Sequence, residues 1–215
     1  MGASPDHQNI FIVGLAGPSG SGKSTLARRV AARLNGHVLS METYSAEMSH
    51  LPLEERAKLD YDAPEAIDVK LLESHIRDYA SGKSVEAPIY DFAQHLREKD
   101  RREHIPAESL LIVEGILALH FAQLRPHFDF SVYLQASEEI CFHRRKVRDI
   151  TERQRSMKLI LWQWENTVLP AARRYLPPSK THANLVLESE SDLATVEKNL
   201  YEAILQKQSL AKNPG

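Results

Sequence analysis

Residues 17–25, which read Gly-Pro-Ser-Gly-Ser-Gly-Lys-Ser-Thr, constrain the fold more than any other stretch of this chain. They match the phosphate-binding loop pattern of a glycine, four residues and then Gly-Lys-Ser/Thr. The loop follows an apolar run, residues 10–16, as expected of a buried parallel strand. After it, Leu26, Val30 and Leu34 recur every four residues and predict the core face of a helix. This order predicts an α/β fold of the P-loop NTPase type, with a parallel sheet flanked by helices.

Each residue type in the loop has a physical role toward a nucleoside triphosphate. Glycines let the backbone approach the phosphates closely, so that successive N–H groups point at the anion. Lys23 can reach the β- and γ-phosphates, and the Ser24 hydroxyl can bind Mg²⁺. The helix that begins near Lys23 adds the positive end of its dipole. The predicted nucleotide-binding residues are Gly17, Pro18, Ser19, Gly20, Ser21, Gly22, Lys23, Ser24 and Thr25.

Composition narrows the classes of protein that remain. A chain of 215 residues with a net charge of −2 is long enough for one α/β domain and lacks the basic balance of a nucleic-acid binder. Its single cysteine, Cys141, allows no intrachain disulfide, and no stretch approaches 18 consecutive apolar residues. We therefore expect one cytoplasmic domain over residues 1–215, without membrane or nucleic-acid partners, and with flexible tails at 1–9 and 207–215.

Two acids stand directly after predicted strands. Glu42 follows the short strand candidate 37–41, and Glu114 ends the apolar run that begins at Leu110. Ligands of parallel sheets bind beyond the carboxyl ends of the strands, so both acids are predicted to face the phosphate loop. Glu114, together with Ser24, is a candidate Mg²⁺ ligand. The alternatives are a solvated loop acid at position 42 and an acid that merely ends a strand at 114.

The segment between these strands contains two further signals. Asp62 precedes Pro64, which suits the first turn of a helix running to about residue 79, so Asp62 would cap that helix or point into the site. Residues 84–102 alternate, contain aromatics and include Pro88, which restricts a strand to an edge position. We predict a small β-hairpin inserted over the substrate pocket.

A run of cations follows a core strand predicted at 128–134. Residues 138 to about 164 are predicted to be helical, and Arg145, Arg148 and Arg155 share one face of that helix by spacings of three and seven. Such runs are usually solvated. Beside a triphosphate they can instead stabilise the charge of a transferring phosphoryl group, so we predict a helical lid over 144–175. A strand at 183–187 and a helix at about 191–206 complete the domain.

These stretches resemble one family, the uridine (uridine–cytidine) kinases, which are related to phosphoribulokinase. The resemblance covers roughly residues 10–190. It rests on the stretches Gly-Pro-Ser-Gly-Ser-Gly-Lys-Ser-Thr (17–25), Tyr-Asp-Ala-Pro-Glu-Ala-Ile-Asp (61–68), Pro-Ile-Tyr-Asp-Phe-Ala-Gln-His-Leu-Arg (88–97), Val-Glu-Gly-Ile-Leu-Ala-Leu (113–119), Arg-Arg-Lys-Val-Arg-Asp-Ile-Thr-Glu-Arg-Gln-Arg (144–155) and Pro-Ser-Lys-Thr-His-Ala-Asn (178–184).

The resemblance implies ATP- or GTP-dependent phosphorylation of the 5′-hydroxyl of uridine and cytidine, in a homo-oligomer that is usually a tetramer. By matching position it implies Lys23, Glu42, Arg153 and Arg155 as catalytic residues and Ser24, Glu114 and Glu42 as Mg²⁺ ligands. The nucleoside side would be formed by Asp62 and Arg148 on the ribose hydroxyls and by Tyr90 and His95 on the pyrimidine. Arg145 and Gln163 would complete the substrate-binding residues.

Some positions depart from the family pattern. Glu42 stands where the family usually has its catalytic aspartate, Gln154 replaces a lid glycine, and Asn184 replaces an aspartate. Two alternatives therefore stay open. One is a related kinase for a sugar phosphate or a pantothenate-like acceptor, and the other is a non-catalytic nucleotide-binding module. The chain contains no Asn-Lys-x-Asp motif for reading guanine, which disfavours a GTPase switch.

Overall fold

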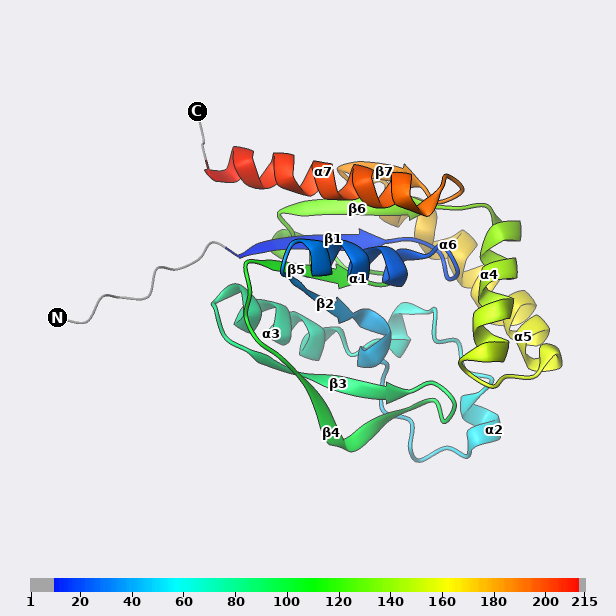
Figure 1. The fold of residues 1–215 in the computed structure, drawn as a ribbon. Helices are drawn as coiled ribbons and strands as arrows, with labels where there is room; N and C mark the ends of the chain where they lie inside the picture. The colour runs from blue at the N-terminus through cyan, green and yellow to red at the C-terminus, as the bar shows by residue number, and fades with distance from the viewer. Residues whose placement is uncertain (1–9, 213–215) are drawn as a thin grey trace.

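The computed structural model describes residues 10–212, and its centre is a five-stranded sheet in which every strand pair is parallel. The strand order is β2-β5-β1-β6-β7, so the chain crosses over between most neighbours (Figure 1). The strands are β1 (Phe11–Ala16), β2 (His37–Ser40), β5 (Leu110–Glu114), β6 (Phe130–Gln135) and β7 (Leu185–Glu188). The predicted α/β fold with a parallel sheet is confirmed.

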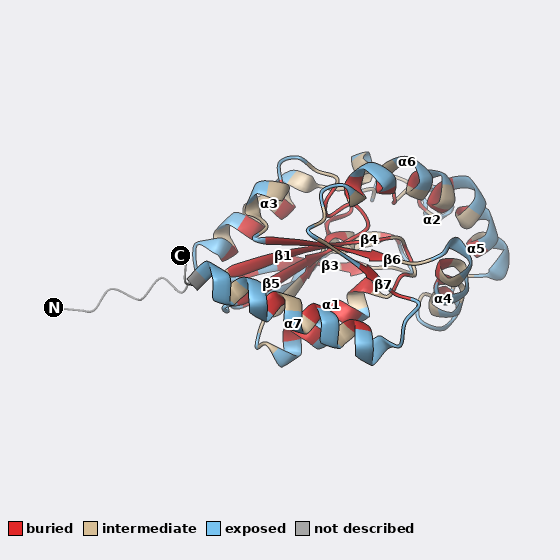
Figure 2. Cartoon of the chain, turned by 90° about the horizontal axis from the view of Figure 1, so that it is seen from above, coloured by how far each residue is buried: buried red, intermediate tan, exposed pale blue. Residues whose placement is uncertain are grey.

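Helices cover both faces of this sheet (Figure 2). On one face, α1 (Lys23–Arg33) and α7 (Leu193–Lys212) bury apolar side chains such as Leu26 and Leu200 against the strands. On the other, α3 (Val69–Ala80) and α6 (Leu169–Lys180) do the same. Strands β1 and β5 are buried at every position, which explains why their sequences are continuous apolar runs rather than alternating ones.

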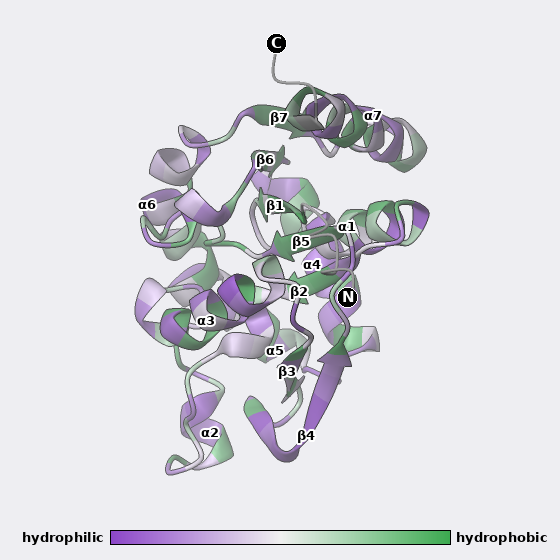
Figure 3. Cartoon of the chain, turned by 90° about the vertical axis from the view of Figure 1, so that its left-hand side faces the viewer, coloured by the Kyte–Doolittle hydropathy of each residue, from purple (hydrophilic) through white to green (hydrophobic). Residues whose placement is uncertain are grey.

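The predicted hairpin is present as a separate two-stranded antiparallel sheet of β3 (Val85–Asp91) and β4 (Leu96–Ile105). It extends three residues beyond the predicted end at 102. The outer strand β4 is strongly hydrophilic (Figure 3), whereas Val85, Ala87 and Ile105 join the core on the α3 side. One edge of the hairpin is thus anchored in the core, and its turn at residues 92–95 is free to reach the site.

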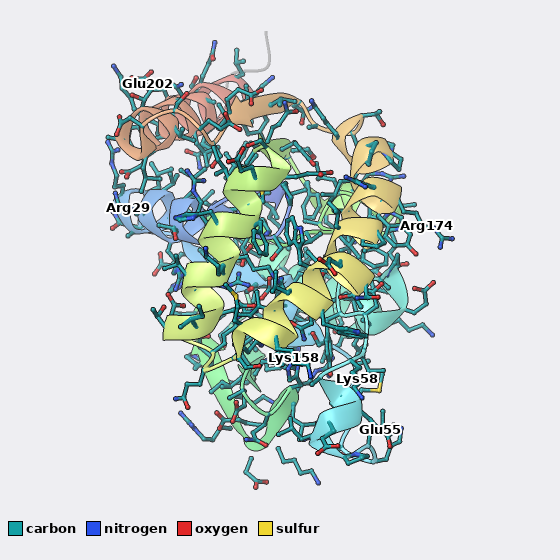
Figure 4. All side chains as sticks on the ribbon, turned by 90° about the vertical axis from the view of Figure 1, so that its right-hand side faces the viewer. Arg29, Glu55, Lys58, Lys158, Arg174 and Glu202 are labelled. Atoms are coloured by element: carbon teal, nitrogen blue, oxygen red, sulfur yellow. The ribbon has the colours of Figure 1, made fainter. Side chains whose placement is uncertain are left out.

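The helix predicted over 138–164 is interrupted. It consists of α4 (Glu138–Thr151) and α5 (Met157–Gln163), followed by a π-helical turn, η4 (Trp164–Val168), that leads into α6. The break contains Gln154, whose φ of +53° lies in the left-handed region that a helix interior excludes. Helices α4, α5 and α6 lie at the end of the sheet toward which the strands point (Figures 1 and 4).

Further boundaries differ from the sequence prediction. Pro64 lies in a short 3-10 turn, η2 (Pro64–Ala66), and Asp68 rather than Asp62 caps α3, accepting a hydrogen bond from the Leu71 N–H at 3.2 Å. Helix α7 continues through Lys212, so residues 207–212 are not a tail. Residues 1–9 and 213–215 lie outside the described part. The remaining short elements are η1 (Met41–Tyr44), α2 (Leu53–Arg56) and η3 (Arg125–His127).

Candidate active site

The phosphate loop connects β1 to α1 at the carboxyl end of the sheet. Gly20 has φ +87°, and a Cβ atom built there would lie 2.2 Å from the Cys141 carbonyl oxygen, so the close contact between loop and α4 requires glycine. Lys23 is buried, and its Nζ donates to the Pro18 carbonyl at 3.3 Å, within the loop itself. Of the predicted nucleotide-binding residues, those that line a cavity over the loop are Gly20, Gly22, Lys23, Ser24 and Thr25.

Glu114 lies at the end of β5, directly beside this loop. Its Oε1 accepts hydrogen bonds from the hydroxyls of Ser24 at 3.1 Å and Ser40 at 2.7 Å. Its buried Oε2 has no hydrogen-bond partner among the described residues. Burial raises the pKa of Glu114, and the nearby Lys23 lowers it in part. An unpaired carboxylate oxygen beside the loop hydroxyl is a suitable ligand for a hard cation such as Mg²⁺.

The described residues contain no group of three or more His, Cys, Asp or Glu side chains that could hold a metal ion alone. Mg²⁺ is usually bound through one or two protein ligands together with phosphate oxygens and water. Ser24 and Glu114 therefore fit the predicted metal site. Ser40, which holds the Glu114 carboxylate, was not predicted from the sequence.

Glu42 follows β2 in the 3-10 turn η1 and points toward the lid. Its carboxylate accepts a hydrogen bond from Arg153 at 2.8 Å, forming an ion pair whose side chains are 25 % and 12 % exposed. Burial favours the neutral acid, but Arg153, Arg148 and Lys23 outweigh it and hold the pKa of Glu42 well below its usual range. Glu42 is therefore anionic and faces both the phosphate loop and the lid.

A pocket lies between η1, the hairpin and the lid helices, next to Glu42. It contains most of the residues predicted for the acceptor side, drawn from segments far apart in the sequence. Their side chains mix apolar surface with a few polar groups, which is typical of a small-molecule site. The predicted residues that line it are Glu42, Asp62, Tyr90, His95, Arg145, Arg153, Arg155 and Gln163, and the pocket also includes Tyr61 and Phe92, which were not predicted.

His95 forms part of the wall of this pocket from the tip of the hairpin. Its ring stacks on Tyr61 with centroids 5.1 Å apart, and it has φ +52° in the turn. Its Nε2 lies 3.4 Å from a guanidinium nitrogen of Arg155. Burial, and next the charge of Arg155, lower the pKa of His95 to about 4, so the ring is neutral at physiological pH. The side chain is buried in the pocket wall although it comes from a hairpin turn.

Asp62 and Tyr90 also face into the pocket. Asp62 is 8 % exposed, and burial raises its pKa while Arg145 opposes the shift. The Tyr90 hydroxyl is buried and has no hydrogen-bond partner among the described residues. Gln163, in contrast, is fully engaged: it donates to the Ala57 carbonyl at 2.8 Å and accepts from Arg155 at 3.2 Å. Asp62 and Tyr90 are thus available to a ligand, whereas Gln163 fixes the wall.

Arg148 is the one predicted acceptor residue that does not line this pocket. It lines the larger cavity over the phosphate loop, together with Lys23, Ser24 and Glu114. Glu42, Phe92 and Arg153 line both cavities. The Arg153 guanidinium also lies 4.0 Å from the centre of the Phe92 ring. The Glu42–Arg153 pair therefore stands where the phosphate-loop cavity and the acceptor pocket meet.

The sequence prediction missed Asp149, the residue on which the lid arginines converge. It is fully buried in α4, and Arg145, Arg148, Arg153 and Arg155 all approach its carboxylate within 2.7–3.8 Å. The signal was present in the sequence as an acid four residues from Arg145 and four from Arg153. Arg155, predicted on the helix face, reaches it from the loop after α4.

The fold and the site are those of the class of P-loop kinases. They combine a parallel sheet, a phosphate loop, a strand-end acid and an arginine lid over a separate acceptor pocket. The model of the family described as "Phosphoribulokinase / Uridine kinase family" matches residues 12–196 of this chain. The chain therefore belongs to the phosphoribulokinase/uridine kinase family.

Among the described residues, no helix is both long and apolar enough to cross a membrane.

Alignments with uridine kinases cover most of this chain and most of each relative. It is 38 % identical over 187 residues to a uridine kinase from Shewanella amazonensis, covering 84 % of this chain and 88 % of the relative. It is 36 % identical over 189 residues to a uridine kinase from Lactobacillus helveticus, covering 85 % and 89 %.

Solved structures with this fold are more distant in sequence. One, described as a possible uridine kinase from Bacillus stearothermophilus, has a TM-score of 0.56 at 20 % identity, with 87 % and 91 % coverage. Another, provisionally described as a fructose transport system kinase from Silicibacter sp. TM1040, has a TM-score of 0.66 at 23 % identity, with 86 % and 93 % coverage. These likenesses concern the fold alone.

Proposed function

We propose that this chain transfers the γ-phosphoryl group of ATP or GTP to the 5′-hydroxyl of uridine and cytidine. The single observation that supports this most is the joining of two cavities at Glu42 and Arg153. One cavity contains the phosphate loop. The other is lined by Tyr61, Tyr90 and His95, whose flat rings suit a base. The family and the uridine kinase relatives agree with it.

The residues divide the work of phosphoryl transfer between the two sides. On the donor side, Lys23 and the loop N–H groups bind the phosphates, and Ser24 and Glu114 would hold Mg²⁺, which neutralises charge on the phosphate oxygens when bound. On the acceptor side, Asp62 accepts hydrogen bonds from ribose hydroxyls. Glu42 at the junction orients the 5′-hydroxyl, and Arg153 stabilises negative charge on the transferring group.

The acceptor distinguishes this proposal from its alternatives. A coupled assay of ADP release should show turnover with uridine and cytidine, and little with purine nucleosides, ribulose 5-phosphate or pantothenate. Turnover restricted to ribulose 5-phosphate or pantothenate would assign the pocket to another small acceptor. Absence of turnover with all of them, despite ATP binding, would support a non-catalytic module.

The proposal also covers the domain structure, the assembly and the location of the protein. Residues 1–215 act as one domain, with the hairpin and the region 144–175 moving over the site, and the protein works as a homo-oligomer in the cytoplasm. The two cavities share Glu42, Phe92 and Arg153 in their walls, which is consistent with a single catalytic unit.

We predict that the kcat/KM values for uridine and cytidine lie within about tenfold of each other. In His95→Ala, kcat/KM should fall for both nucleosides. The two bases differ chiefly at C4, where uridine accepts and cytidine donates a hydrogen bond. Neutral histidine has one donor and one acceptor nitrogen, and a tautomer change or ring flip exchanges them. Leaving a buried polar group without a partner costs about 1–3 kcal/mol, or roughly 5- to 150-fold in kcat/KM. Unchanged kinetics for both pyrimidines in His95→Ala would remove this residue from the base site.

The pH dependence of nucleoside binding should reflect a neutral His95. Its pKa is lowered to about 4 by burial and by Arg155, Arg153 and Arg56, with Asp149 opposing. A histidine with a lowered pKa stays uncharged until the pH falls through that value, so its contribution to binding is constant above about pH 5. We expect the KM for uridine to be flat between pH 6 and 8 as far as His95 is concerned. A rise in KM below pH 7 that disappears in His95→Asn would contradict this.

A further inference from the structure

Asp149 lies between the two groups of lid arginines, and its two carboxylate oxygens serve different sides of the site. Oδ2 faces Arg155 at 3.0 Å and Arg145 at 3.5 Å, and both of these arginines line the acceptor pocket. Oδ1 faces Arg148 at 2.7 Å and Arg153 at 3.8 Å; Arg148 lines the phosphate-loop cavity, and Arg153 lines both cavities where they meet. The side chain itself lines neither cavity, so its influence on a ligand is indirect.

Each arginine pair also contacts other residues of the site. On the acceptor side, Arg155 reaches His95 at 3.4 Å, and Arg145 donates to the Ser19 hydroxyl of the phosphate loop at 2.7 Å. On the donor side, Arg153 holds Glu42 at 2.8 Å. A displacement of any one guanidinium group therefore changes the position of the Asp149 carboxylate that the others share.

The energetics make this arrangement sensitive to its central charge. Four buried or half-buried cations surround one fully buried anion. Burial alone would raise the pKa of Asp149, but the four guanidinium groups outweigh it and keep the carboxylate ionised. Removing one partner of a buried ion pair leaves the other charges uncompensated, which is strongly unfavourable. The arginines are thus held against their mutual repulsion by Asp149.

We propose that Asp149 is a positioning residue that couples nucleoside binding to the arrangement of the phosphate-side arginines. Nucleoside in the acceptor pocket fixes Arg155 and Arg145 on one carboxylate oxygen, and the other oxygen then holds Arg148 and Arg153 in place for the triphosphate. Binding of either substrate accordingly strengthens binding of the other. This inference rests on the proposed function, since it takes a pyrimidine nucleoside and a nucleoside triphosphate as the two ligands.

The substitution Asp149→Asn tests the coupling with little change in shape. Asparagine has one acceptor oxygen and one NH₂ donor, so in either orientation the donor faces one of the two arginine pairs. The measured quantity is the Kd of uridine by calorimetry, with and without a saturating non-hydrolysable ATP analogue and Mg²⁺. We expect the analogue to tighten uridine binding to the unmodified protein by about fivefold or more, a typical allosteric coupling.

In Asp149→Asn we expect the analogue to change the Kd of uridine by less than about twofold, and kcat to fall by roughly 100-fold. The matched control is Glu197→Gln. Glu197 also pairs with two arginines, Arg29 at 3.4 Å and Arg33 at 3.0 Å, but on α1 and α7, outside both cavities. In Glu197→Gln, the factor by which the analogue tightens uridine binding, and kcat, should stay at the values of the unmodified protein.

Should Asp149→Asn fail to fold, Arg148→Lys takes its place. Arg148 donates to Oδ1 with two nitrogens, at 2.7 and 2.9 Å, and lysine cannot reproduce this paired contact. Reduced coupling in this variant supports the proposal. Full coupling in either variant, or uridine binding to the unmodified protein without any coupling, overturns it while leaving the proposed function intact. If uridine does not bind the unmodified protein at all, the proposed function fails, and this inference fails with it.

Discussion

Replacing Lys23 by alanine is expected to reduce kcat by at least about 10³-fold, with little change in the temperature of unfolding measured without nucleotide. The ammonium group is the one lysine charge in the phosphate-loop cavity, among the residues that the structure describes. Fixed charges at the transferring phosphoryl group contribute on the order of 10²–10³-fold each, and more where water is excluded. Its only hydrogen bond among the described residues is to the Pro18 carbonyl at 3.3 Å. Losing that bond has a small effect on folding, about 1 kcal/mol.

The control for this variant is Lys198→Ala. Lys198 lies on the exposed face of α7, where its side chain is 69 % exposed and forms a weak pair with Glu202 at 3.9 Å. It should lower neither kcat nor the unfolding temperature. If Lys23→Ala instead lost stability in proportion to activity, the lysine would be a structural residue, and the phosphate loop would have to be interpreted as a packed turn.

Much of the fold could be predicted because its strands carry local patterns. The continuous apolar runs of β1 and β5, the phosphate loop and the leucine and valine spacing of α1 each determine their element within a few residues. The break after α4 could not be predicted in this way. Residues 152–156 contain neither proline nor glycine, yet Gln154 adopts a left-handed conformation, and the Arg155 N–H after it donates to the Asp149 carbonyl at 2.9 Å.

The candidate site was predictable to the extent that its residues lie at strand ends or in the matched motifs. Glu114, Asp62 and His95, predicted on these grounds, each line one of the two cavities. Arg148 was assigned to the ribose by its matching position in the family, and it shares a helix face with Arg145, which lines the acceptor pocket. Arg148 itself lies in the cavity over the phosphate loop.

Asp149 and Ser40 were missed for a different reason. Both act through other side chains: Ser40 lines the phosphate-loop cavity but donates its hydroxyl to Glu114 at 2.7 Å, and Asp149 lies behind the arginines. Such supporting residues have no pattern of their own, because their role depends on which side chains the tertiary fold brings to them. Between residues 144 and 155 the sequence has six cations and two acids, Asp149 and Glu152, so Asp149 is easily taken as local charge balance.

The position of Glu42 leads to the other large expected effect. Glu42→Gln should lower kcat by roughly 10²- to 10⁴-fold, the range associated with a positioned proton acceptor, while Glu42→Asp should retain measurable activity. The glutamine keeps the length of the side chain and can still accept a hydrogen bond from Arg153, now 2.8 Å away, so the lid contact survives. What it lacks is the negative charge that orients the 5′-hydroxyl and accepts its proton. Single-turnover measurements with saturating uridine and ATP would separate this loss from effects on binding.

The variant Glu42→Asp makes the opposite change to Glu42→Gln. It keeps the charge but withdraws the carboxylate by one methylene, so the pair with Arg153 at the junction of the two cavities is lost or lengthened. The low pKa of Glu42 is due largely to Arg153, which makes the carboxylate a weak base in the state described. Activity in Glu42→Asp would therefore show that the carboxylate acts on the hydroxyl without depending on the pair. If Glu42→Gln turned over at the rate of the unmodified protein, Glu42 would serve only to hold the lid. Asp62, which burial leaves with a raised pKa in the same pocket, would then be the better candidate for the base.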